Sequence, residues 1–243
     1  MPSKKVLSFS LWGIMPSKKV LSFSLWGSKP HYNIGSIKNA ELAKEFYPDF
    51  ECWFYIHKES VPIETIEKLN LISNTKIIFK TGDLNTIKPM MWRFESIDDP
   101  EVEIMLSRDT DTRILLREKL AVDEWLNSKT LFHIMRDHPD HGYVILGGMF
   151  GTRKIPHLQS WIEVMNTFNQ DGDRMYDQNF LKDYIYPVIR DNSIIHTSFH
   201  IYSNENTRRF PTEYCSEYKF VGEYVYEDES RCLSDVERLI NSL

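Results

Sequence analysis

The alternation of strand-like and helix-like segments constrains the fold of this chain more than any other feature. Strands are expected at residues 19–25, 50–57, 76–79, 101–106, 131–136, 143–146, 193–199 and 218–225. Helices are expected at 36–46, 63–71, 114–126, from Pro156 to 168, and at 180–188, with a helical turn at 89–94. Strands that alternate with helices predict one α/β domain with a mostly parallel central sheet and helices on both faces.

Composition excludes several classes of protein. The 243 residues are 42% hydrophobic and 26% charged, with a net charge of −6, so the chain is expected to be globular rather than disordered. The excess of acidic residues argues against a general nucleic-acid binder. The sequence contains no apolar run of about 18 residues, so no membrane span is expected. Cys52, Cys215 and Cys232 are widely spaced, which favours reduced thiols and a cytoplasmic location over a disulfide framework or zinc site.

The N-terminus contains an exact repeat. Residues 1–13 recur as 15–27, with Ile14 between the copies. We interpret this as a duplicated start in which Met15 is the ancestral first residue and the second copy supplies the first core strand. The domain is therefore expected to span 15–243, and deletion of 1–14 should leave folding and activity intact.

Two acidic residues follow the strand expected at 101–106. In open α/β sheets, ligands bind beyond the carboxyl ends of strands, where Asp109 and Asp111 fall. Two carboxylates separated by one small residue can share a hard divalent cation whose other ligands are phosphate oxygens. The pattern alone is weak, because Asp171 and Asp173 form a second copy of it and such pairs are often solvated turns.

Arginines surround this acidic pair in the sequence, and arginine is suited to bidentate phosphate contacts. They are Arg93, Arg108, Arg113 and Arg117. Arg113 and Arg117 also fit ordinary helix-face charges, and Arg117 fits that interpretation better.

A series of short motifs runs along almost the whole chain. They are Met91-Trp92-Arg93-Phe94, residues 107–113, Arg117-Glu118-Lys119, residues 121–126, 132–139, 147–151 and 177–181, Ile185-Tyr186-Pro187, and Phe220-Val221-Gly222-Glu223. In this order they resemble a family of GT-A glycosyltransferases that occurs in bacteria and large DNA viruses, and the likeness covers roughly residues 19–229. The resemblance implies a single-domain GT-A fold and transfer from a nucleotide sugar, with a UDP-sugar favoured, to a glycan or other hydroxyl acceptor.

The resemblance also implies roles for individual residues. Asp109 and Asp111 would hold Mn²⁺ or Mg²⁺, with His196 as a third ligand. The donor would contact Leu25, Trp26, Gly27, Asp83, Arg93, Arg108, Thr110, Gly147 and Gly148 as well as Asp109. Asp177 and Gln178 would face the sugar. This sequence has Thr197 where relatives have Asp, so no role is carried over to that position.

The residues themselves leave two candidates, Asp177 and Asp137, for the carboxylate that faces the sugar or the acceptor. Asp177 shares a helical face with Phe180 and Leu181 and so points inward, which suits either a helix cap or a site residue. Asp137 follows the strand at 131–136 and is the rival base for the acceptor hydroxyl. The histidine-rich stretch 133–141 could suggest a metal site, but a polar loop is the favoured interpretation. Gly147 and Gly148 would allow a sugar to approach the backbone closely.

Two other functional classes compete with a transferase. Asp109 and Asp111 with Thr112 match the DxDxT motif of haloacid-dehalogenase-like phosphatases, and residues 172–177 imitate their GDxxxD motif. That phosphatase motif usually ends the first strand, whereas about a hundred residues precede Asp109 here. The third class is a non-catalytic nucleotide- or glycan-binding module, which would have the metal site without a productive base.

Overall fold

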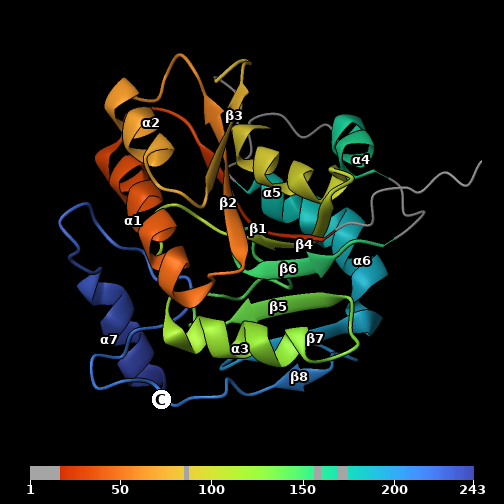
Figure 1. Ribbon diagram of the computed structural model, residues 1–243. Coiled ribbons are helices and arrows are strands. Elements are labelled where there is room, and N and C mark those ends of the chain that lie inside the picture. The colour runs from red at the N-terminus through yellow and green to blue at the C-terminus, as the bar shows by residue number, and fades with distance from the viewer. Residues whose placement is uncertain (1–16, 85–87, 156–159, 169–174) are drawn as a thin grey trace, which may run out of the picture.

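A computed structural model describes residues 17–84, 88–155, 160–168 and 175–243 (Figure 1). One sheet of eight strands runs through the described chain, in the order β3-β2-β1-β4-β6-β5-β7-β8. The strands are β1 (Lys18–Leu25), β2 (Phe50–His57), β3 (Thr75–Lys80), β4 (Val102–Ser107), β5 (Phe132–Arg136), β6 (Phe150–Arg153), β7 (Ser193–Thr197) and β8 (Thr207–Arg208). Only β6 runs antiparallel to its neighbours, so the predicted single α/β domain with a mostly parallel sheet is confirmed.

Helices cover both faces of the sheet. The α-helices are α1 (Pro30–Phe46), α2 (Ile63–Asn70), α3 (Leu116–Leu126), α4 (Trp161–Thr167), α5 (Tyr176–Phe180), α6 (Tyr186–Ile189) and α7 (Leu233–Ser242). Shorter turns are the 3₁₀ segments η1 (Lys88–Asp98) and η3 (Arg190–Asn192) and the π-helical η2 (Leu181–Ile185).

Side-chain alternation along β1 divides the interior into two cores. Leu21, Phe23 and Leu25 pack with residues of α1, α2 and α3, whereas Val20 packs on the opposite face with residues of η1, α4, α5 and α6. Successive strand residues point to opposite faces, so a strand buried on both sides is apolar almost throughout. Both cores are therefore visible in the sequence of β1 and β2.

Two predicted strands are wrong. Residues 143–146 form a turn-rich segment that leads to β6 at Phe150–Arg153, and only Ile145 among them is fully buried. Residues 218–225 are irregular, apart from an isolated bridge between Val225 and Arg231. Their backbone groups bond to other segments, as Val225 N–H does to the carbonyl of Asp111 at 2.9 Å.

Two further expectations lie outside the described residues. These are the start of the helix at Pro156 and the duplicated segment 1–14. The second copy of the repeat does contain the first core strand, since β1 begins at Lys18.

Strand order places a natural ligand-binding edge next to β1. Both β2 and β4 pair with β1 in parallel, one on each side, so the direction of strand progression reverses between β1 and β4. A crevice forms at such a reversal, outside the carboxyl ends of the strands. Trp26 follows β1 and Arg108 follows β4 at this edge.

Candidate functional site

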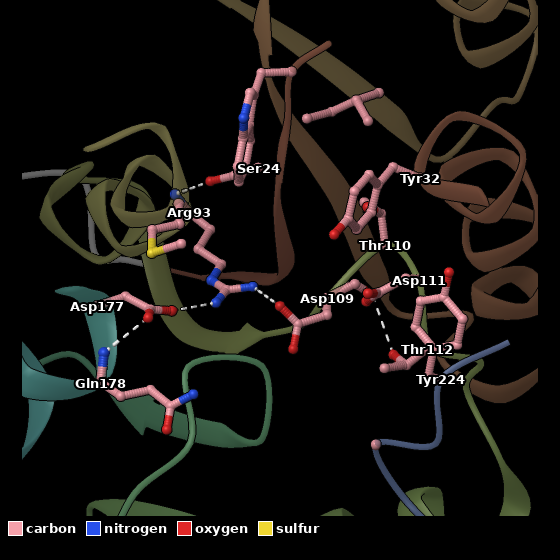
Figure 2. Close-up of a pocket in the computed structure, with 14 residues that line it drawn as sticks. Ser24, Tyr32, Arg93, Asp109, Thr110, Asp111, Thr112, Asp177, Gln178 and Tyr224 are labelled. Carbon is pink, nitrogen blue, oxygen red and sulfur yellow. Dashed lines mark hydrogen bonds and ion pairs between the residues drawn. The ribbon is translucent and has the colours of Figure 1, made fainter. Parts of the chain in front are cut away.

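A cavity of about 320 Å³ opens at the carboxyl ends of β1 and β4 (Figure 2). It is lined by Ser24, Leu25, Trp26, Tyr32, Met90, Arg93, Asp109, Thr110, Asp111, Thr112, Asp177, Gln178, Gly222 and Tyr224. The end of β1 places residues 24–26, and the segment after β4 places residues 109–112. The segment η1 places Met90 and Arg93, and α5 places Asp177 and Gln178. The predicted gathering of a carboxylate pair, an arginine and an inward carboxylate is therefore found in one cavity.

Arg93 lies at the centre of this cavity and joins two carboxylates. Its Nη1 pairs with Asp109, and its Nη2 lies 2.8 Å from Oδ2 of Asp177. Figure 2 shows the guanidinium between the two carboxylates. Burial would lower the pKa of Arg93, but Asp109 and Asp177 outweigh that effect and raise it. Arg93 is therefore a permanent cation at the centre of the cavity, shared between the acidic pair and α5.

Two serines on β1 fix the backbone of Arg93. Ser22 Oγ donates a hydrogen bond to the Arg93 carbonyl at 2.6 Å, and Arg93 N–H donates to Ser24 Oγ at 3.0 Å. These bonds attach η1 to the middle of the sheet. The guanidinium is consequently positioned by the sheet rather than by a mobile loop.

The two carboxylates of the acidic pair differ in their surroundings. Asp109 is held by Arg93, and its side chain is 40% exposed to the cavity. No side chain of the described residues donates to the Asp111 carboxylate. Burial, followed by repulsion from Asp109, raises the pKa of Asp111 to about 7. Asp111 therefore carries the less compensated negative charge of the two.

This donor set fits a hard divalent cation. Carboxylate oxygens are the ligands that Mg²⁺ and Mn²⁺ prefer, and a metal would compensate the charge that raises the pKa of Asp111. Among the described residues, no group of three His, Cys, Asp or Glu side chains converges on one point. Asp109 and Asp111 could thus supply two ligands, with the remaining positions open to phosphate oxygens and water.

Gly147 and Gly148 lie against the charged groups of the cavity. A side chain at Gly147 would meet the Asp177 carboxylate and the Arg93 guanidinium, and one at Gly148 would meet the Asp109 carboxylate. The Gly147 carbonyl is fixed by Ser107 Oγ, which donates to it at 2.6 Å. Only glycine lets this segment approach the ion pairs so closely, and the neighbours in this structure are the side chains of Asp177, Arg93 and Asp109.

Asp177 is a buried carboxylate with a partly neutralised charge. Gln178 N–H donates to its Oδ1 at 2.8 Å, and Arg93 holds its Oδ2. Burial raises the pKa of Asp177, although Arg93 opposes the shift. The Oε1 atom of Gln178 is buried and has no hydrogen-bond partner among the described residues.

Asp137, the rival base, lies outside this cavity. It is fully buried at the end of β5 and accepts two hydrogen bonds from Arg117, both at 2.8 Å. It also accepts from Ser198 Oγ at 2.6 Å, Tyr214 O–H at 2.8 Å and Val221 N–H at 2.9 Å. These five bonds connect the end of β5 to Arg117 of α3, to Ser198 after β7, and to the segment that contains Tyr214 and Val221. Arg117 is therefore a partner of Asp137 in this network.

His196 also lies outside the lining of the cavity. Its Nδ1 is 2.8 Å from Nε2 of His133, and its Nε2 is 3.2 Å from Glu124. Burial lowers the pKa of both histidines. Both ring nitrogens of His196 are therefore engaged away from the acidic pair.

Five predicted donor contacts do not line the cavity: Gly147 and Gly148, described above, and Gly27, Asp83 and Arg108. Arg108 is buried and bonds to Glu118 at 2.7 Å and to the Phe150 carbonyl at 3.0 Å. Gly27 directly follows Trp26, and its N–H donates to Ser60 Oγ at 2.8 Å. Asp83 is exposed beyond the end of β3. The predicted contacts at Leu25, Trp26, Arg93, Asp109 and Thr110 do line it.

Several lining residues were not identified from the sequence. Ser24, Tyr32, Met90 and Tyr224 have no role in the sequence analysis, and Thr112 and Gly222 occur there only as parts of motifs. Tyr224 reaches the cavity because the C-terminal segment returns to the acidic pair, where Val225 bonds to Asp111 and Glu229 pairs with Arg113 at 2.8 Å. A contact between residues more than a hundred positions apart leaves no local signal.

The phosphatase interpretation is weakened by the strand that carries the acidic pair. Asp109 follows β4, the fourth of the described strands, whereas the phosphatase motif usually ends the first strand. Residues 171–174, which hold most of the second acidic motif, lie outside the described residues.

Known proteins are similar to this chain in backbone structure, at low sequence identity. None of the described helices is long and apolar enough to cross a membrane. The sequence matches no known family profile and no curated protein. The fold is that of an α/β domain with a ligand cavity where its strand order reverses.

Solved structures share this backbone arrangement at low identity. A glycosyltransferase involved in the glycosylation of the major capsid of PBCV-1 is 17% identical, with a TM-score of 0.48 over 75% of this chain and 82% of that chain. An active-site mutant of LgtC is 10% identical, with a TM-score of 0.44 over 92% and 96%. 4-Diphosphocytidyl-2C-methyl-D-erythritol synthase from Anaerococcus prevotii is 13% identical, with a TM-score of 0.42 over 77% and 91%.

Proposed function

We propose that this protein is a metal-dependent glycosyltransferase that uses a nucleotide sugar, with a UDP-sugar favoured, and a glycan or other hydroxyl acceptor. The observation that carries the proposal is the placement of Asp109 and Asp111 beside the buried cation Arg93, in a cavity where the strand order reverses. A diphosphate carries several negative charges, and this arrangement offers it one fixed cation and two ligands for another.

The two ends of the cavity suit the two ends of such a donor. Tyr32 and Tyr224 lie on the side of Arg93 away from Asp177 (Figure 2), and the Trp26 ring stacks with that of Tyr32 with 6.5 Å between centroids. Aromatic faces suit a nucleoside base. Asp177 and Gln178 lie beyond Arg93 at the other end and suit the sugar hydroxyls.

Departure of the diphosphate is the step that this site would assist most. A divalent cation at Asp109 and Asp111 would neutralise charge that develops on the leaving diphosphate. Arg93 would donate to the same oxygens from a position fixed by Ser22 and Ser24. Because Arg93 is already fixed, it would need little reorganisation as the bond between the sugar and the diphosphate breaks.

Asp177 is the carboxylate best placed to act near the sugar. If the anomeric centre inverts, a base must take the proton of the acceptor hydroxyl, and each carboxylate oxygen of Asp177 retains a free lone pair. If the configuration is retained, no base is strictly required and Asp177 would orient the sugar. Asp137 has no such access, since it is fully buried among five hydrogen bonds outside the cavity.

A panel of nucleotide sugars tests the proposal with a thermal-shift assay in Mn²⁺, in Mg²⁺ and in a chelator. We expect one donor to raise Tm only with metal and to be hydrolysed slowly without an acceptor. A nucleotide that binds without any donor turnover would indicate a binding module. Hydrolysis of a generic aryl phosphate, lost on Asp109→Asn, would indicate a phosphatase.

A further inference from the structure

A second cavity, the β7–β8 groove, lies at the carboxyl ends of β7 and β8. Its volume is about 550 Å³, which is larger than the 320 Å³ of the cavity around Arg93. Its walls include Arg117, Ser198, Phe199, Ile201, Arg209 and Tyr214. None of these residues lines the first cavity.

The groove and the first cavity open on the same edge of the sheet. Strands β4 and β5 both run antiparallel to β6 and therefore point the same way, and β7 and β8 run parallel to β5. Strands β4 and β7 are separated by three inter-strand spacings, which amounts to roughly 14 Å. A ligand that occupies both places must be an extended chain rather than a single sugar.

Asp137 connects the walls of the two openings. Its Oδ1 accepts hydrogen bonds from Ser198 and Tyr214, which line the groove. Its Oδ2 accepts from Val221 N–H at 2.9 Å, and the next residue, Gly222, lines the first cavity. One buried carboxylate thus fixes both openings relative to each other, as a ligand that spans them would require.

The groove lining has the chemistry of a saccharide site. Hydroxyls of Thr207 and Thr212 and the ring of Phe199 combine hydrogen-bonding groups with an apolar face, whereas Ser198 and Tyr214 already contact Asp137 and Arg117. The guanidinium of Arg209 is exposed and forms no ion pair or hydrogen bond with the described residues, so its five donors are available.

Charge selects among possible saccharides. Glu213 also lines the groove and likewise forms no ion pair with the described residues, so it balances Arg209. Arg117 and Arg208 are already paired, with Asp137 and Glu124. An uncharged, hydroxyl-rich ligand therefore fits this lining better than an anion or a cation.

We propose that the β7–β8 groove binds the neutral sugar residues of an acceptor oligosaccharide that are remote from the hydroxyl being glycosylated. This inference rests on the proposed function, because it requires the donor to lie in the first cavity. The acceptor chain would run along the sheet edge from Asp177, past Asp137, to Arg209.

Saturation-transfer NMR with the full chain tests the groove directly. The probes are neutral linear di- to hexasaccharides of glucose, galactose and mannose, each measured with wild type, Arg209→Ala and Phe199→Ala. We expect the longer probes to bind more tightly than disaccharides, and either substitution to weaken the longer probes about tenfold, the effect of losing one good contact. Arg209→Ala should fold normally because its side chain is exposed, and Tm checks this for Phe199→Ala.

Arg190→Ala is the matched control, since Arg190 is a surface arginine just before the opposite end of β7. It should leave binding of every probe unchanged. Affinity that is the same in wild type and Arg209→Ala, no dependence on probe length, or no binding of any neutral probe would overturn the inference. Preferential binding of acidic oligosaccharides would overturn its assignment of a neutral ligand.

A separate titration with UDP and Mn²⁺ distinguishes the two levels of the argument. Wild type and Arg209→Ala should bind UDP equally. If wild type binds neutral oligosaccharides but not UDP, the proposed function fails while the saccharide site stands. If it binds UDP but no oligosaccharide, the groove assignment fails alone.

Discussion

Arg93 Nη2 and Asp177 Oδ2 lie 2.8 Å apart across the cavity, and both side chains are more than nine-tenths buried. The same guanidinium holds Asp109 on its other side. A buried cation shared by two carboxylates couples the acidic pair after β4 to the first turn of α5. Substitution of Arg93 leaves the buried Asp177 carboxylate without its cation, whereas substitution of either carboxylate leaves Arg93 with one remaining partner.

This coupling predicts a large non-additive effect on stability. Arg93→Met should lower the free energy of unfolding by about 3–5 kcal/mol, because the buried Asp177 and the partly exposed Asp109 both lose their partner. Asp177→Asn should cost less in the Arg93→Met background than in wild type, since the pair is already broken. Urea unfolding of the four proteins measures this cycle. Strictly additive effects would show that the two side chains do not interact in solution.

Gly147 offers a geometric test of the same ion pair. Gly147→Ala would place a methyl group on the Asp177 carboxylate and the Arg93 guanidinium, so we expect a loss of about 1–3 kcal/mol and weaker donor binding. Gly142→Ala is the matched control, because its nearest neighbour would be His200 at 3.7 Å, an ordinary contact. Equal stability and equal donor binding of the two variants would contradict the placement of residues 147 and 148.

The two candidate bases should behave in opposite ways. Asp137→Asn disrupts the bidentate pair with Arg117, so we expect a loss of stability of about 3–5 kcal/mol, with donor binding retained while the protein is folded. Asp177→Asn should retain UDP binding and lose transfer. Unfolding curves and transfer assays on both variants at a low temperature separate the roles. Normal transfer by Asp177→Asn would remove this residue from the reaction.

Protonation of His141 is expected to cause part of the loss of stability in acid. Burial, with a contribution from His138, lowers the pKa of His141 to about 3. In the unfolded chain His141 has a pKa near 6.5, so it takes up its proton at a higher pH than it does in the folded protein. The stability from His141 is therefore present above pH 6.5 and is lost as pH falls toward 3. His141→Asn, which can still accept from Asp137 N–H, should reduce the slope of unfolding free energy against pH between 6 and 4 by up to about 1.4 kcal/mol per pH unit. An unchanged slope in urea titrations would show that His141 is protonated in the folded state.

The sequence predicts the charged residues at the centre of the cavity better than the other residues that line it. Asp109 and Arg93 could be placed together because one follows a parallel strand and the other lies in a motif next to it. Asp177 could be placed inward from its spacing to Phe180. These inferences use local periodicity and the general behaviour of strand ends, both of which survive folding.

Long-range contacts account for the parts that were not predictable. Tyr224 lines the cavity only because its segment returns to Asp111, and residues 218–225 have a strand-like composition that their bonding overrides. Asp137 has the sequence context of an exposed polar loop, yet its carboxylate is fully buried and accepts five hydrogen bonds. Its partners come from positions 117, 198, 214 and 221, so no local pattern reveals them.

Isothermal titration of UDP in the presence of Mn²⁺ tests the central claim most directly, with wild type, Asp111→Asn and the exposed control Asp183→Asn. We expect wild type and Asp183→Asn to bind UDP only when metal is present. Asp111→Asn should lose at least tenfold in affinity, because a carboxylate ligand to the cation is gone. UDP binding that is equally tight with a chelator, or equally tight in Asp111→Asn, would contradict the assignment of this acidic pair to a metal-held diphosphate.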